Sequence, residues 1–145
     1  SRQVTGVQTC ALPIWDILAE NPRNRVVVFG EQPEMLRFPC STQSYTDIEG
    51  SGGNFNLSSS PEVMADFFTF AGVDYIYLGS GYLKPGTDGF RNVTGLLKQG
   101  YLSDLLYENG NGLAVFSSEP TELTEEESEA LLAEFTEKYW PGEQQ

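Results

Sequence analysis

Short apolar runs alternate with amphipathic stretches along the chain, and this alternation predicts strands separated by helices. Residues 25–30 are almost wholly apolar and rich in β-branched side chains, which is typical of a strand covered on both faces. A helix is expected between Ser60, which can cap it, and Gly72, which can end it, with Pro61 at its first position. Residues 73–78 form a second strand. The order strand, helix, strand predicts a parallel pair.

The helix between Ser60 and Gly72 is expected to pack on this parallel pair. Its apolar residues recur at helical spacing and form one stripe: Val63, Met64, Phe67, Phe68 and Ala71. The connection before it, residues 31–60, is too long for an ordinary loop. We therefore expect a short strand within it, near residues 36–38 or near residues 43–45.

The second half of the chain predicts another helix and a hairpin. Residues 90–99 have helical spacing and end at Gly100. Two strand-like runs, residues 102–108 and 113–116, then flank the sequence Asn-Gly-Asn-Gly. This is a strong hairpin turn because Asn and Gly tolerate positive φ. The sheet is therefore expected to gain an antiparallel edge.

The C-terminal residues predict an acidic helix. Residues 124–127 read Thr-Glu-Glu-Glu, a capping box in which the hydroxyl and a carboxylate each accept a backbone N–H. Its apolar residues are expected to pack on the domain: Leu131, Leu132, Phe135 and Tyr139. The predicted fold class is α/β, a small three-layer or two-layer domain with a parallel central strand pair, an antiparallel edge hairpin and a C-terminal acidic helix.

Length, charge and composition narrow the classes of function. The chain has 145 residues, the size of one ordinary domain, and a formal net charge of -13 from 8 Lys and Arg against 21 Asp and Glu. Such a chain would repel a phosphate backbone, so nucleic acid is not expected as a partner. Histidine is absent, which excludes Ser-His-Asp and Cys-His catalysis and His-ligated zinc. No apolar run reaches the roughly 18 residues of a membrane-spanning helix.

The first residues are interpreted as a non-native scar. Residues 4–14 read, without a break, as one frame of a widely used short-read sequencing adapter. A natural segment would match an adapter codon by codon only by extraordinary chance, so we exclude residues 1–14 from the fold. The expected single domain is then residues 15–145, cut from a longer environmental gene. Cys40 is the only cysteine expected to be genuine.

A small polar cleft is a candidate binding site, because ligands of open α/β sheets bind beyond the carboxyl ends of parallel strands. Those ends are followed here by Gly30-Glu31 and by Gly-Ser-Gly-Tyr at residues 79–82. Glu31 and Ser80 could form hydrogen bonds there, and Tyr82 could offer a stacking surface. The alternative is that these glycines only let the chain turn after each strand. Neither turn is a Gly-x-Gly-x-x-Gly fingerprint, and no cofactor is expected.

The remaining motifs favour no catalytic residue and no metal. The glycine-rich residues 49–54 lack the Lys and Ser or Thr of a phosphate-binding loop. The glutamates of the last helix are typical of a solvated face. Sequons at Asn56 and Asn92 matter only if the host glycosylates proteins. Tyr75 and Tyr77 alternate with an apolar residue, so we expect them to pack rather than to stack on sugars.

Four groups of segments carry a family resemblance: Asn21-Pro22 before residues 25–30; residues 67–72 leading into 73–78; residues 100–102; and residues 105–110 with 113–116. In this order they resemble the C-terminal soluble domain of polytopic bacterial glycosyltransferases of the GT-C type. That type includes the protein O-mannosyltransferase-like and aminoarabinose-transferase-like groups. The resemblance spans most of residues 25–116.

The resemblance implies a membrane-bound parent that transfers a sugar from a polyprenyl-phosphate carrier at the extracytoplasmic face of a bacterial membrane. Its catalytic acid would lie in a loop between membrane helices upstream of Trp15, so no catalytic residue is carried over to this chain. The partners implied are the membrane-embedded part of the same parent, with a lipid-linked sugar or a glycan acceptor. The alternative is an independent α/β domain, without enzymatic activity, that binds a small ligand or a partner in the cleft of Glu31 and Ser80.

Overall fold

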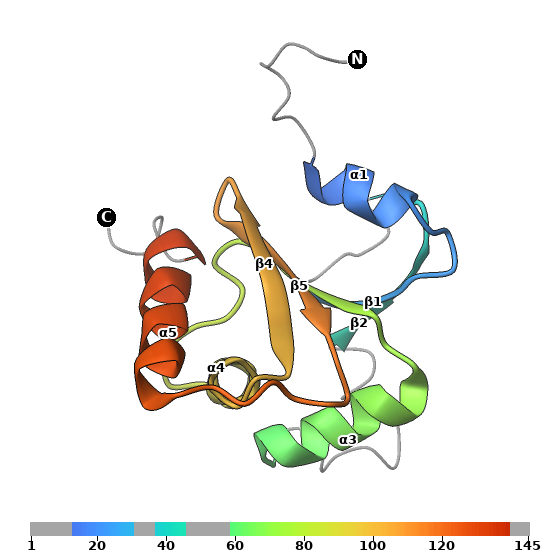
Figure 1. The fold of residues 1–145 in the computed structure, drawn as a ribbon. Coiled ribbons are helices and arrows are strands. Elements are labelled where there is room, and N and C mark those ends of the chain that lie inside the picture. Colours follow the sequence, from blue (N-terminus) through green and yellow to red (C-terminus); the bar gives the residue numbers. More distant parts are fainter. Residues whose placement is uncertain (1–12, 31–36, 46–58, 140–145) are drawn as a thin grey trace.

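A sheet with helices on both of its faces forms the domain (Figure 1). The computed structural model describes residues 13–30, 37–45 and 59–139. Within these ranges the strands are β1 (Arg25–Phe29), β2 (Ser41–Ser44), β3 (Tyr75–Leu78), β4 (Leu102–Glu108) and β5 (Asn111–Phe116). The helices are α1 (Pro13–Ala19), α3 (Pro61–Ala71), α4 (Asp88–Lys98) and α5 (Glu125–Tyr139). The predicted α/β class is confirmed.

Strand β1 lies inside the sheet between two parallel neighbours. The strand order is β2-β1-β3-β5-β4. Val27 of β1 pairs with Gln43 of β2 on one side and with Ile76 of β3 on the other, in parallel both times. The predicted parallel pair is therefore confirmed, and β2 adds a third parallel strand. It lies near the second of the two positions where the sequence predicts a strand in the long connection.

Side chains of β1 alternate between two apolar clusters. Val27 and Phe29 belong to the main cluster, which also contains residues of α3, α4 and α5. Val26 and Val28 belong to the second cluster, with residues of α1 that include Ile14 of the adapter-like segment. These four apolar side chains are at most 2% exposed, whereas Arg25 at the start of β1 is exposed. The sheet thus separates a layer of α3, α4 and α5 from a layer that contains α1, which is the three-layer form of the prediction.

Both ends of α3 form as the sequence predicts. The Ser60 hydroxyl accepts a hydrogen bond from the backbone N–H of Val63 at 3.1 Å. Gly72 ends the helix with a φ of 71°, a left-handed conformation that favours glycine. These two caps fix the position of α3 between the long connection and β3.

The buried face of α3 differs in part from the predicted stripe. Phe68 is buried as expected, but Val63 is 37% exposed whereas Ala65 is 1% exposed. The helix packs against α4 as well as the sheet. A Cβ atom at Gly95 of α4 would lie 2.3 Å from the Pro61 Cγ, so the two helices approach closely. Ala65 follows Pro61 by one turn on the same side, and the contact with α4 therefore buries it.

The hairpin of β4 and β5 forms around a two-residue turn. Asn109 and Gly110 have φ values of 55° and 82°, the conformation that fits the twist of antiparallel strands. β5 begins at Asn111, which pairs with Glu108, so this strand starts two residues earlier than predicted. The antiparallel hairpin itself is confirmed, with β4 at the edge of the sheet.

A bulge in β4 changes which side chains reach the core. Asp104 and Leu105 together oppose Ala114 of β5, and Asp104 has a φ of 50°. The extra residue shifts the alternation of the strand. Leu102 and Leu105 consequently both contact the main cluster, although they are three residues apart, while Leu106 contacts the second cluster.

The acidic helix α5 begins at the predicted capping box. The Thr124 backbone N–H donates to the Glu127 carboxylate at 2.9 Å, and the Glu127 N–H donates to the Thr124 hydroxyl at 3.1 Å. Phe135 and Tyr139 are each 1% exposed in the main cluster. The acidic side chains at the start of the helix are exposed, as expected for a solvated face.

Replacing Phe68 by alanine tests whether the contact between α3 and the sheet carries the stability of the fold. Phe68 is fully buried and packs edge-on against Phe116, with ring centroids 5.6 Å apart. We expect Phe68→Ala to lower the free energy of unfolding by roughly 3 to 5 kcal/mol. Phe70→Ala is the matched control, because Phe70 lies on the same helix and is 88% exposed. Denaturant unfolding measures both, and equal losses would contradict this packing.

Candidate functional site

The carboxyl ends of β1 and β3 meet, as the predicted cleft requires. The backbone N–H of Gly79 donates to the Phe29 carbonyl at 2.9 Å. Ser80, the next residue, is exposed, and its N–H donates to the Asn111 side-chain oxygen at 2.7 Å. Glu31 lies outside the described residues. The structure therefore places Ser80 beside the hairpin of β4 and β5 rather than alone at the end of β3.

A tyrosine from α5 holds the loop that follows β3. The Tyr139 hydroxyl accepts a hydrogen bond from the Leu83 N–H at 2.9 Å and donates one to the Gly79 carbonyl. Its ring stacks on Phe135 at a centroid distance of 5.0 Å. Tyr82 is half-buried and packs against the main cluster. The space beside the loop is thus occupied by aromatic side chains, and a binding role for Glu31, Ser80 and Tyr82 stays a prediction.

Sequence reasoning missed this role of Tyr139. The residue was expected only to pack, because its position on the helical stripe gives no information about its hydroxyl. A buried tyrosine hydroxyl usually finds a hydrogen-bond partner, and this general rule is the one signal that could have suggested a contact. The loop to which it binds lies more than fifty residues earlier in the sequence.

Burial raises the pKa of side chains that could otherwise take part in proton transfer. Loss of solvation is the main cause that raises the pKa of the Cys40 thiol, and the charge of Asp74 raises it further, so the reactive thiolate is disfavoured. Burial also raises the pKa of Tyr77 to about 12 and shifts that of Tyr107 upward. Tyr77 packs edge-on against Phe38 at 5.1 Å, which confirms that it is a packing residue.

One of the two sequons can be placed in the structure. Asn92 of the second sequon lies on α4 and is 0% exposed, so the folded domain does not present its side chain to a glycosylating enzyme. Asn56 and the glycine-rich residues 49–54 lie outside the described residues. Within residues 13–30, 37–45 and 59–139, no group of three or more His, Cys, Asp or Glu side chains could hold a metal ion.

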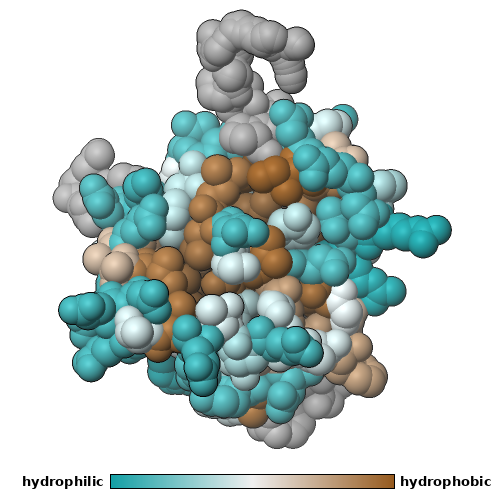
Figure 2. All heavy atoms as spheres, viewed as in Figure 1, coloured by the Kyte–Doolittle hydropathy of each residue, from teal (hydrophilic) through white to brown (hydrophobic). Residues whose placement is uncertain are grey.

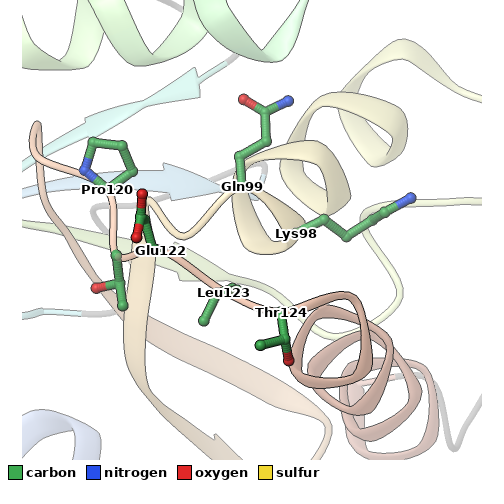
Figure 3. A pocket seen from close by; sticks show the side chains of 7 residues that line it. Lys98, Gln99, Pro120, Glu122, Leu123 and Thr124 are labelled. Atoms are coloured by element: carbon green, nitrogen blue, oxygen red, sulfur yellow. The ribbon is translucent and has the colours of Figure 1, made fainter.

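Two cavities of moderate size lie away from the predicted cleft. One, of about 500 Å³, is lined by the end of α4 and the segment before α5 (Figure 3). In it Pro120 and Glu122 stand opposite Gln99. A backbone hydrogen bond of Glu62 itself lowers the pKa of this carboxyl group on α3, and a hydrogen bond from the Gln99 side chain lowers it further. The other cavity, of about 630 Å³, opens at the amino ends of β1 and β2.

Comparisons with protein-family models, with curated proteins and with solved structures found no match to this chain. In the part of the chain that the structure describes, no helix is both long enough and apolar enough to cross a membrane.

Removing the Tyr139 hydroxyl tests whether α5 holds the loop after β3. Tyr139→Phe leaves the Leu83 N–H and the Gly79 carbonyl without this partner, and we expect a loss of about 1 to 3 kcal/mol in the free energy of unfolding. Amide exchange at Leu83 should also become faster. Tyr101→Phe is the control, because the Tyr101 hydroxyl has no hydrogen bond to a described residue. If both variants unfold alike and Leu83 keeps its exchange rate, the loop is held by other contacts.

Proposed function

We propose that this chain is the extracytoplasmic C-terminal domain of a polytopic bacterial GT-C type membrane glycosyltransferase, and that it is not catalytic by itself. The observation that carries the proposal is the position of the resembling segments in the fold. Residues 25–30 and 73–78 contribute β1 and β3, residues 100–102 and 105–110 contribute most of β4, and residues 113–116 contribute most of β5; these strands are adjacent in one sheet. The resemblance thus follows four neighbouring strands of one sheet rather than scattered surface segments.

An apolar surface beside α1 supports a contact with the membrane-embedded part of the same parent. Figure 2 shows apolar side chains gathered over the strands, in the region between α1 and α5. Partly buried residues of the second cluster contribute to this surface, including Ile17 of α1 and Leu106 of β4. Trp15 of α1 is 38% exposed and donates its indole N–H to the Arg37 carbonyl at 3.1 Å.

In the proposed parent the reaction takes place elsewhere. A catalytic acid in a loop between membrane helices would promote transfer of the sugar from a polyprenyl-phosphate carrier to an acceptor. The domain described above would bind or position the acceptor or the lipid-linked sugar. The proposed location is the extracytoplasmic face of a bacterial membrane. In this proposal the membrane-embedded part, whose residues would precede Trp15, determines which donor sugar and which acceptor are used.

The second candidate function is an independent α/β domain that binds a small ligand or partner without enzymatic activity. The cavity of about 630 Å³ at the amino ends of β1 and β2 favours it, because ligand pockets of proteins have volumes of this order. The two candidates differ upstream of Trp15. A glycosyltransferase parent requires many membrane-spanning segments there, whereas an independent domain requires none.

Recovery of the intact gene decides between the two candidates. Long-read sequencing of DNA from the same source should replace the adapter-like residues 4–14 with natural sequence. We expect the frame upstream of Trp15 to encode several segments of about 20 apolar residues, each long enough to span a membrane. An intact open reading frame that starts shortly before Trp15, with no such segment, would exclude the glycosyltransferase parent and leave the independent domain.

A further inference from the structure

The cavity at the amino ends of β1 and β2 has an unusual charge for this chain. It lies at the opposite end of the parallel strands from Gly79 and is lined by three stretches: residues 22–27 around the start of β1, residues 41–43 of β2, and residues 70–73 at the end of α3. Among the residues that the structure describes, Arg23 and Arg25 are the charged ones that line it. In a chain with 8 Lys and Arg against 21 Asp and Glu, a cavity whose described lining residues include two positive and no negative side chains has an unusual composition.

The two arginines differ in how firmly they are held. The Arg25 guanidinium donates through Nη1 to the Ala71 carbonyl at the end of α3, at 2.8 Å. The backbone N–H of Arg25 donates to the Asp74 carboxylate at 2.9 Å. These contacts fix Arg25 at the wall of the cavity. The Arg23 guanidinium makes no hydrogen bond or ion pair with a described residue, and its side chain is exposed.

The other walls combine neutral polar groups with one aromatic ring. Ser41 and Gln43 of β2 lie in register with Arg25 and Val27 of β1, on the face of the sheet that α3 covers, and they supply a hydroxyl and an amide group. Thr42 lies in register with Val26 and points to the other face. Across the cavity, Phe70 is 88% exposed, whereas Phe68 of the same helix is fully buried. Phe70 therefore contributes little to the core of the described domain. An exposed ring beside polar donors suits a ligand that has both an apolar face and hydroxyl groups.

We propose that this cavity binds a single sugar residue that carries a carboxylate or a phosphate. The anionic group would be bound by the guanidinium of Arg23, beside the fixed charge of Arg25, because planar guanidinium groups match carboxylate and phosphate oxygens. The sugar hydroxyls face the polar groups of β2, and the C–H face of the ring packs on Phe70. This inference rests on the lining residues alone, so it stands whether or not the parent is a glycosyltransferase.

Titration of the isotope-labelled domain with three probes tests the site and identifies the anion. Glucuronate carries a carboxylate, glucose 6-phosphate carries a phosphate, and glucose carries neither. We expect at least one charged sugar to shift the backbone NMR signals of residues 22–25, 41–43 and 70–73, and to bind about tenfold or more tightly than glucose. The charged sugar that binds more tightly distinguishes a carboxylate site from a phosphate site.

Variants at exposed positions separate the site from a general charge effect. Arg23→Gln should weaken binding of the charged sugar about tenfold, and Arg23→Lys should restore part of it. Phe70→Ala should weaken binding of charged and neutral sugars alike. Lys138→Gln is the matched control, because it removes one exposed positive charge on α5, and it should leave the affinity unchanged.

Three results would overturn the proposal. Glucose could bind as tightly as both charged sugars, which would remove the role of the anion. The shifted signals could be scattered over the surface or absent at millimolar concentrations of all three probes. Arg23→Gln and Lys138→Gln could weaken binding equally, which would reduce the effect to the net charge of the chain.

Discussion

Burial of β1 on both faces is the constraint on which the rest of the structure depends. Its four apolar side chains enter two different clusters, and its backbone pairs in parallel with β2 and with β3. A strand in this position needs a helical layer on each side, because either face left open would expose valine and phenylalanine to water. The positions of α1 and of α3, α4 and α5 follow from this need.

The features that the sequence predicts best are those fixed by neighbouring residues. Ser60 and Gly72 cap α3, Thr124 and Glu127 form the capping box of α5, and Asn109-Gly110 makes the turn, each through backbone geometry that a few residues determine. The apolar run of β1 was also readable, because a strand that is covered on both faces has no polar alternation. These local signals were enough to predict the α/β class and the parallel pair.

Features that depend on distant contacts could not be predicted. The length of the connection predicted a short strand at one of two positions, but β2 is polar, with the sequence Ser-Thr-Gln-Ser, so only its pairing with β1 decides between them. Ala65 is buried because of the close contact of α3 with Gly95 on another helix. For the candidate sites, sequence pointed to the carboxyl ends of the parallel strands, where Tyr139 holds the loop. The cavity at the other end combines residues from three separate stretches, none of which carries a recognisable motif.

Native-state hydrogen exchange, read amide by amide, tests the central position of β1 most directly. If β1 lies between two parallel strands and two apolar layers, the amides of Val27 to Phe29 and of Ile76 to Leu78 should exchange only through global unfolding, at the slowest rate in the domain. Exchange of the β1 amides at the faster rate of an edge strand, while the β3 amides stay protected, would contradict the account and place β1 outside the core of the sheet.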